Sequence, residues 1–421
     1  MRVIVLIDGE HHPGVVRDAL DRLAIEHEIA GVLFVGGEEK VPSDVLADPR
    51  RHYGRDVVRG SELPQVDADA VFDLSGDPVL TIDRRLSIAA VALDRGLEYV
   101  APGLRLSPPP VERIETGVPM LGVIGTGKRT GKTAVAGHLA TLLRERGVEP
   151  VVVSMGRGGP PEPQLVRAGE RLDAARLLEI SRSGAHAASD YLEDAALTGA
   201  ATVGTRRCAE GPAGEVFDSN VADGVRLALS LDPGAIVLEG SGASLPPVAA
   251  HRTVCVTRGG QDALSGLGPL RLMRSDLAIL LGDTDQDLPH PRVVRCQLDP
   301  EPAEPVPPGA RAAVFTTARP EDAGRIQAEL ERKGVEVAML STNLARRREL
   351  EHDLEQAAQM RCDLFLTELK AAAVDTVAER AVRDGVPVVW LRNRVVSRAG
   401  EPDLDDELWR LFEEVATPVQ T

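Results

Sequence analysis

The segment GVIGTGKRTGKTAVAGHLA, residues 122–140, limits more strongly than any other what this chain can fold into. An apolar run typical of a buried strand leads into a glycine-rich turn, and a helical pattern follows it. Backbone N–H groups of such a turn, together with the helix dipole, form a concave anion site. Gly131, Lys132 and Thr133 have the spacing of a phosphate-binding loop. We therefore expect Lys132 to reach the β- and γ-phosphates of a nucleotide and the Thr133 hydroxyl to bind Mg²⁺.

One position departs from the usual G-x-x-x-x-G-K-[ST] pattern, because Thr126 replaces its first glycine and Gly125 lies one place earlier. This variant resembles the loop of the dethiobiotin synthetase branch of P-loop proteins. Two further cations, Lys128 and Arg129, either face the phosphates or are solvated at the loop tip. The expected nucleotide-binding residues are Gly125, Thr126, Gly127, Lys128, Arg129, Thr130, Gly131, Lys132 and Thr133.

A second strand-like run, AIVLEGSG, ends in Glu239. An acidic residue at the carboxyl end of a parallel strand can hold or orient a metal ion and its water shell. We therefore expect Thr133 and Glu239 to form the metal site, a pattern similar to the E-G-x-G of the dethiobiotin synthetase branch. The alternative is that Glu239 merely caps a loop; Asp190 and Asp194 are reserve acidic ligands.

Strand and helix patterns alternate along the whole chain, which predicts open α/β sheets. Proline-rich segments interrupt the pattern near residues 107–118 and at residues 299–309. The second segment is rich in proline and acid, so we expect neither helix nor central strand there. The predicted architecture is a central P-loop NTPase domain, dethiobiotin synthetase-like, flanked by Rossmann-like N- and C-terminal α/β domains. The expected domain bounds are 1–112, 113–300 and 309–421.

Composition excludes several classes of protein. A chain of 421 residues that is 43% hydrophobic can bury a sizeable core, and it has no apolar run of about 18 residues that could cross a bilayer. The net charge of −17 opposes nonspecific binding to nucleic acid or to an anionic membrane. We expect a cytoplasmic protein.

The four cysteines lack C-x-x-C spacing, so we expect reduced, buried thiols and no zinc site.

Two loops at strand ends combine arginine with paired glycines and are candidates for binding a second anion. SMGRGGP contains Arg157, Gly158 and Gly159, and VTRGGQD contains Arg258. Glycine lets the backbone approach an anion closely, and arginine grips phosphate in a fork. The plain alternative is that these are turns that contain arginine; Arg206 and Arg207 make a weaker case. Only five of the 48 basic residues are lysines, and two of them lie in the phosphate loop.

Two further loops carry candidate substrate-binding residues. LIDGEHHP, after the first strand, brings together Asp8, Glu10, His11 and His12. A lone histidine is usually structural, but four ionisable groups at a strand's carboxyl end favour a binding cleft. Lys370, in TELKAAAVD, is the matching candidate from the C-terminal region.

These motifs together, in this order along nearly the whole chain, resemble the cyclic 2,3-diphosphoglycerate synthetase family. The resemblance implies an ATP- and Mg²⁺-dependent enzyme, a homodimer, that closes an intramolecular phosphoanhydride in 2,3-diphosphoglycerate and releases ADP and phosphate. From the residues themselves we expect only a nucleotide-dependent enzyme with a strongly anionic second substrate. The residues expected to act in catalysis are Lys132, Lys128, Arg157 and Arg258. Those expected to bind substrate are Asp8, Glu10, His11, Arg157, Gly158, Gly159, Arg258 and Lys370.

Other functions stay open on the sequence. One is a kinase that makes 2,3-diphosphoglycerate from 2-phosphoglycerate; another is an ATP-dependent ligase like dethiobiotin synthetase, which would need a site for a neutral amine and fewer arginines. A third is a regulatory P-loop NTPase. Such a switch predicts a guanine-selective motif of the N/T-K-x-D type, for which TRGGQD, residues 257–262, is a poor match.

Overall fold

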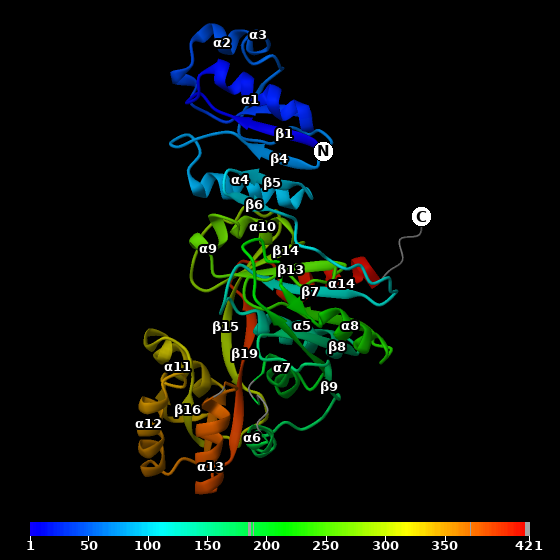
Figure 1. The fold of residues 1–421 in the computed structure, drawn as a ribbon. Helices are drawn as coiled ribbons and strands as arrows, with labels where there is room; N and C mark the ends of the chain where they lie inside the picture. The colour runs from blue at the N-terminus through cyan, green and yellow to red at the C-terminus, as the bar shows by residue number, and fades with distance from the viewer. Residues whose placement is uncertain (184–186, 188, 371, 417–421) are drawn as a thin grey trace.

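The computed structural model describes residues 1–183, 187, 189–370 and 372–416, and they form two β-sheets flanked by helices (Figure 1). The N-terminal sheet has the order β3-β2-β1-β4-β5-β6 and is parallel except for β6. Its strands are β1 (Arg2–Ile7), β2 (Glu28–Phe34), β3 (Val58–Arg59), β4 (Ala70–Asp73), β5 (Glu98–Ala101) and β6 (Leu104–Leu106). Its helices are α1 (Pro13–Glu26), η1 (Glu38–Lys40), α2 (Ser43–Ala47), α3 (Pro49–Tyr53) and α4 (Ile82–Asp94).

The second sheet has 13 strands, and its central part carries the phosphate loop. There the order is β11-β10-β8-β12-β7-β13-β14, with β9 paired to β10. The strands are β7 (Met120–Gly125), β8 (Pro150–Gly156), β9 (Gln164–Val166), β10 (Ala201–Cys208), β11 (Asp218–Ser219), β12 (Ala235–Glu239), β13 (Arg252–Thr257) and β14 (Leu277–Leu281). The helices are α5 (Lys132–Glu145), α6 (Ala174–Arg182), α7 (Asp190–Thr198), α8 (Val221–Leu229), α9 (Gln261–Leu264) and α10 (Gly268–Met273).

Helices cover both faces of this central part, which explains why β7, β8, β12 and β14 are nearly continuous apolar runs. Leu121 and Val123 of β7 pack on the face that α5 covers, whereas Met120 packs on the face that α8 covers. All six residues of β7 are buried. The expected strand, loop and helix around the phosphate loop are therefore confirmed.

The same sheet continues into the C-terminal region through β15 and β19, in the order β14-β15-β19-β18-β16-β17. These strands are β15 (Val293–Pro302), β16 (Arg311–Phe315), β17 (Glu336–Ser341), β18 (Leu364–Glu368) and β19 (Val388–Ser397). The helices are η2 (Pro320–Asp322), α11 (Ala323–Arg332), α12 (Arg347–Gln359), the π-helix η3 (Ala373–Ala378), α13 (Glu379–Asp384) and α14 (Leu404–Ala416). The last of these helices, α14, packs on the core that α5 also contacts.

The antiparallel pair β15–β19 turns the carboxyl edges of the two parts of the sheet toward each other. The last residue of β14 is level with Cys296 of β15, whereas the last residue of β18 is level with Leu391, opposite Pro302. Six residues of strand, at about 3.3 Å each, place these two edges roughly 20 Å apart. Both long strands are visible in Figure 1 as the connection between the centre and the lower part of the molecule.

The expectation that residues 299–309 contain no central strand is wrong for its first four residues, which belong to β15. Beyond Cys296, β15 pairs only with β19. The N–H of Ala303 donates to the Trp390 carbonyl, so the N–H groups of odd-numbered neighbours point toward β19. Pro300 and Pro302 occupy the alternate positions, where a missing N–H breaks no ladder bond.

The C-terminal region also packs against helices of the central region. One apolar cluster contains Leu177 of α6 and Leu192 of α7 together with Phe315, Phe365 and Trp390. The indole N–H of Trp390 donates to the carbonyl of Leu172 at 2.9 Å. The two regions are therefore joined by a shared core as well as by the strands.

The cysteines differ in burial, and the expectation of buried thiols is wrong for Cys208. Cys255 and Cys296 are buried, Cys362 is half-buried and Cys208 is exposed, and all four are free. Cys208 ends β10 beyond the last residue that pairs with β8, where only the short strand β11 lies beside it. Burial raises the pKa of Cys255 and of Cys296 to about 12.

We predict that Cys208 reacts fastest with a disulfide reagent at pH 8, because the reactive species is the thiolate of an accessible thiol. Cys362 should react more slowly, since burial raises its pKa, and Cys255 and Cys296 only after unfolding. Absorbance-monitored thiol titration should therefore show one fast phase that disappears in Cys208→Ser. A fast phase that persists in this variant would contradict the assignment.

Candidate functional site

The phosphate loop joins β7 to the N-terminus of α5, and its backbone is held in an unusual conformation. Gly131 has φ +106°, and a Cβ there would lie 2.3 Å from Cδ1 of Leu281. Arg129 also has a positive φ, of 61°. A side chain at position 131 would thus clash with the core, which explains the glycine before Lys132. The Nε of Arg258 donates to the Arg129 carbonyl at 3.1 Å and so ties this loop to the loop after β13.

Lys132 extends along the loop from the first turn of α5. Its Nζ donates to the Gly127 carbonyl at 2.8 Å. Burial lowers the pKa of Lys132, and the charge of Glu239 acts in the opposite direction. The ammonium group is thus held beside the loop backbone at the place where a phosphate group would bind.

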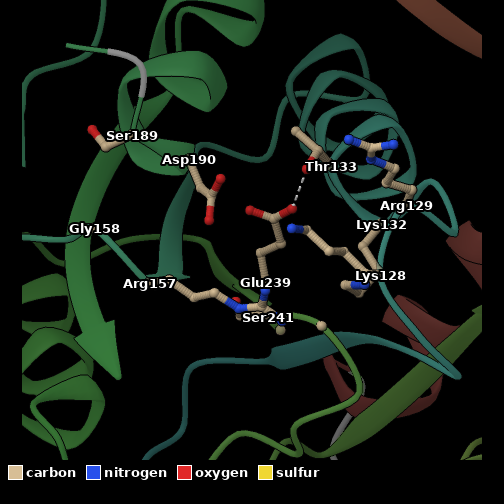
Figure 2. A pocket seen from close by; sticks show the side chains of 12 residues that line it. Lys128, Arg129, Lys132, Thr133, Arg157, Gly158, Ser189, Asp190, Glu239 and Ser241 are labelled. Atoms are coloured by element: carbon tan, nitrogen blue, oxygen red, sulfur yellow. Dashed lines mark hydrogen bonds between the residues drawn. The ribbon is translucent and has the colours of Figure 1, made fainter. Parts of the chain in front are cut away.

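A cavity of about 230 Å³ lies beside the phosphate loop (Figure 2). Its walls combine cations of the loop with acids and small residues from the ends of neighbouring strands and from the start of α7. Figure 2 shows the carboxylates of Asp190 and Glu239 pointing into the same space, with Lys132 next to them. The residues that line it are Lys128, Arg129, Lys132, Thr133, Arg157, Gly158, Ser189, Asp190, Glu239, Gly240, Ser241 and Gly242.

Thr133 and Glu239, expected to form a metal site, are in direct contact. The Thr133 hydroxyl donates to Oε1 of Glu239 at 2.7 Å, and the Ser154 hydroxyl donates to Oε2 at 2.9 Å. Burial raises the pKa of Glu239. Burial, and then the charge of Glu239, raise the pKa of Asp194, whose two carboxylate oxygens are buried without a hydrogen-bond partner. Asp190 lines the small cavity together with Thr133 and Glu239.

This donor set fits Mg²⁺. Among the described residues, no three His, Cys, Asp or Glu side chains are grouped closely enough to hold a metal by themselves. Mg²⁺ prefers one or two carboxylates, a hydroxyl, nucleotide phosphates and water over an all-protein cage. Thr133, Glu239 and Asp190 could supply the protein's share, and the buried, unpaired carboxylate oxygens of Asp194 also suit a cation nearby.

A much larger cleft, of about 1050 Å³, opens from the same loop toward the C-terminal region. One side comprises the loop and residues of α5 and α7. The other comprises residues at and just beyond the carboxyl ends of β16 and β18, together with residues within β15 and β19. Arg258 and Lys370 line this cleft and do not line the small cavity. Arg319 and Arg392 line it as well. The facing carboxyl edges of the two sheet parts therefore enclose one continuous space.

Lys370 crosses this cleft and pairs with Glu193 of α7. Its Nζ donates to both carboxylate oxygens, at 2.7 and 2.8 Å. Burial opposes the charge on Lys370, but the Glu193 carboxylate outweighs it and raises the Lys370 pKa. Glu193 precedes Asp194, so this bridge connects the C-terminal region to the acidic residues below the phosphate loop.

The expected substrate-binding residues of the N-terminal region line neither the cavity nor the cleft. Asp8 is fully buried and accepts from the N–H groups of Glu10, His11 and Gly76 and, at 2.7 Å, from Nδ1 of His11. Glu10 pairs with Lys40. Asp8 thus organises the loops after β1 and β4, and a substrate role for these residues stays a prediction.

Paired glycines after Arg157 have separate explanations. Gly158 lines the cavity, whereas a Cβ on Gly159 would lie 2.0 Å from the Thr205 carbonyl oxygen. Gly159 is therefore required by close packing against β10.

Sequence reasoning missed Ser154, although a serine after three valines in a buried strand is a usable signal. It also missed Glu193 and Ser241.

Comparisons with known proteins agree with this geometry. Three family models match consecutive parts of the chain: the N-terminal domain of cyclic 2,3-diphosphoglycerate synthetase at residues 2–107, its P-loop domain at residues 120–291, and its C-terminal domain at residues 302–394. The chain belongs to the cyclic 2,3-diphosphoglycerate synthetase family.

Relatives of that name match over almost their full length. One from Rubrobacter xylanophilus is 43% identical, with 98% of this chain and 97% of the relative covered. One from Pyrococcus abyssi is 36% identical, with 98% of each covered. One from Methanothermobacter thermautotrophicus is 34% identical, with 98% of this chain and 96% of the relative covered. Within the described residues, no helix is both long and apolar enough to span a membrane.

We predict that Lys370→Met lowers the free energy of unfolding by about 2 kcal/mol, because it leaves the buried Glu193 carboxylate without a cation. This value allows for Lys370 being 44% exposed. The double variant Lys370→Met/Glu193→Gln should recover most of the loss in denaturant unfolding. Arg226→Met, which removes exposed pairs with Glu112 and Asp223, serves as control and should cost less than about 1 kcal/mol. A double variant as unstable as Lys370→Met would contradict the prediction.

Proposed function

We propose that this enzyme converts 2,3-diphosphoglycerate to cyclic 2,3-diphosphoglycerate by ATP-dependent formation of an intramolecular phosphoanhydride, with release of ADP and phosphate. The observation that carries the proposal is the small cavity beside Lys132 and Thr133, which has Arg157 on its wall. An acceptor placed there would lie next to the γ-phosphate of a bound nucleotide. The family's name and the phosphate loop support the same activity.

The two spaces beside the loop suit different parts of the reactants. The backbone of a P-loop cradles the α- and β-phosphates, and its lysine reaches the β- and γ-phosphates. The small cavity contains Lys132 and the acids near Thr133, so it suits the γ-phosphate and the acceptor. The cleft also borders Ala134 and residues 282–284 after β14, and it has room for the nucleoside.

Charge neutralisation is the main task of this site. The substrate has about five negative charges near neutral pH, so ring closure must overcome repulsion between its two phosphates. Lys132, Lys128 and Arg157 line the cavity and would offset this repulsion. Arg258 acts from the cleft side by holding the loop through Arg129. Mg²⁺, when bound at Thr133 and Glu239, supplies further positive charge to the phosphates.

The bond changes follow from these positions. An oxygen of one substrate phosphate attacks the γ-phosphorus of ATP, and the bond to ADP breaks. The neighbouring phosphate then attacks the inner phosphorus of the new pyrophosphoryl group, and inorganic phosphate leaves. Such transfers depend on positioning and electrostatics, so no covalent nucleophile of the protein is required. With ¹⁸O-labelled substrate phosphates, the released phosphate should contain one substrate oxygen; unlabelled phosphate would exclude the stepwise route.

The finer architecture belongs to the same proposal. We propose three domains, with the central one similar to dethiobiotin synthetase; the separate N-terminal sheet and the three matching family domains support the division. The domain bounds, the homodimer and the cytoplasmic location expected from the sequence stay predictions. A 2-phosphoglycerate kinase or a regulatory NTPase would use the same phosphate loop, but neither accounts for the family match.

We predict that ³¹P NMR of the purified protein with ATP, Mg²⁺ and 2,3-diphosphoglycerate shows upfield pyrophosphate-type signals from the metabolite, growing together with ADP and phosphate. In Lys132→Ala these signals should fall at least about 100-fold, because the loop loses its contact to the transferred phosphate. Lys333→Ala is the matched control, since this lysine pairs with Asp299 away from the loop. ATP consumption without the new signals would contradict the proposed activity.

A further inference from the structure

Arg157 is the cation that reaches the small cavity from β8, and its side chain is 47% exposed. A long, half-exposed arginine loses much rotational freedom when it is fixed in one place. Its role as a receptor for an anion therefore depends on what fixes it. In the described part of the chain, Glu210 is the acid within ion-pair distance: Oε2 lies 3.6 Å from Nη2 of Arg157.

Glu210 is itself anchored. The same Oε2 accepts from Nη2 of Arg207 at 2.5 Å and from the Ser244 hydroxyl at 2.9 Å. Arg207 is a rigid partner, because its side chain is only 4% exposed and it also donates to the carbonyls of Ala209 and Ser241. Burial acts to raise the pKa of Glu210, but Ser244, Arg207 and Arg157 together outweigh burial and lower the pKa below its usual value. Glu210 is thus an anion held between two guanidinium groups.

These three side chains converge on Gly242, which lines the small cavity. Gly242 has φ +64°, and a Cβ there would lie 2.5 Å from Nη2 of Arg157, 2.8 Å from Oε2 of Glu210 and 3.0 Å from Nη2 of Arg207. The arrangement is therefore closely packed at the cavity wall. Two guanidinium groups against one carboxylate leave one positive charge for an incoming anion.

We propose that Glu210 is a positioning residue, which holds the guanidinium group of Arg157 at the wall of the small cavity so that Arg157 receives a phosphate group of the acceptor. This inference rests on the proposed function, since it assigns the acceptor to this cavity. Glu210 does not touch the reacting atoms; it acts through Arg157. Fixing the arginine beforehand removes an entropic cost that substrate binding would otherwise bear.

The test is Glu210→Gln, which preserves the shape and an accepting oxygen but removes the charge. We expect the KM for 2,3-diphosphoglycerate to rise about tenfold, equivalent to about 1.4 kcal/mol, while the KM for ATP changes less than about twofold. Glu210→Asp should restore part of the affinity, since it restores the charge. Glu112→Gln, which breaks an Arg–Glu pair remote from the cavity, is the matched control and should leave both KM values unchanged.

A double-variant comparison separates positioning from a general structural role. With Arg157→Met already present, Glu210→Gln should have no further effect on the KM for 2,3-diphosphoglycerate, because the residue through which it acts is gone. If Glu210→Gln raised the KM for 2,3-diphosphoglycerate by the same factor with and without Arg157, the proposal would be overturned. A lower KM in Glu210→Gln would also overturn it, since Glu210 would then be a competitor of the substrate anion.

Failure of the proposed function is distinguishable from failure of this inference. The wild-type ³¹P NMR assay tests the proposed function. The ratio of the KM for 2,3-diphosphoglycerate in Glu210→Gln to that in the wild type tests the positioning role of Glu210. If the wild type forms no cyclic product, calorimetric titration with 2,3-diphosphoglycerate in the presence of a non-hydrolysable ATP analogue measures the dissociation constants of both proteins. The ratio of these dissociation constants then tests the role of Glu210. Absence of any binding to the wild type would reject both.

Discussion

The antiparallel pairing of β15 with β19 is the constraint on which the geometry of the cleft depends. If the C-terminal strands had joined the large sheet in parallel, their carboxyl ends would point the same way as that of β7, and their loops would lie beside the phosphate loop. Because β19 is antiparallel to β15, the carboxyl ends of the C-terminal strands point in the opposite direction, toward the carboxyl ends of the central strands. A shift of six residues along the pair separates the two edges, so that the C-terminal loops face the phosphate loop across a gap. Loops at the carboxyl ends of parallel strands are where α/β proteins bind ligands. This chain therefore brings two such edges to opposite sides of one cleft, and Lys370 can reach Glu193 across it.

Electrostatics beneath the phosphate loop follow from the same arrangement. Glu193, Asp194 and Glu239 are buried close together in a protein whose net charge is −17. Burying carboxylates without cations is costly, and Lys370 offsets this cost for Glu193 alone. Glu239 is stabilised by two hydroxyl donors, and Asp194 by no hydrogen bond that the described residues supply. A cation bound beside these carboxylates, such as the Mg²⁺ proposed at Thr133 and Glu239, would offset the remaining negative charge.

Local patterns in the sequence predicted those parts of the site that depend on neighbouring residues. The spacing of Gly131, Lys132 and Thr133 after an apolar strand indicated the loop, and an acid ending another apolar strand indicated Glu239; the structure places Thr133 and Glu239 in contact. The continuation of the sheet through residues 299–302 was missed, because proline content argues against a strand unless one knows that one edge of it is unpaired. Pairing between strands some 90 residues apart leaves no periodic signal in either strand.

Residues that act through another side chain are harder still to predict from sequence. Arg157 could be chosen because arginine before two glycines suits an anion-binding turn, but Glu210 lies 53 positions later in a loop with no distinctive pattern. Its relation to Arg157 arises only because β8 and β10 are adjacent in the sheet, so that the loops following them meet beside Gly242. An acid next to a cation-rich pocket would be judged unfavourable for an anionic substrate on charge alone. Geometry reverses that judgement: the carboxylate is already neutralised by the buried Arg207, and the orientation that it imposes on Arg157 matters more than its formal charge.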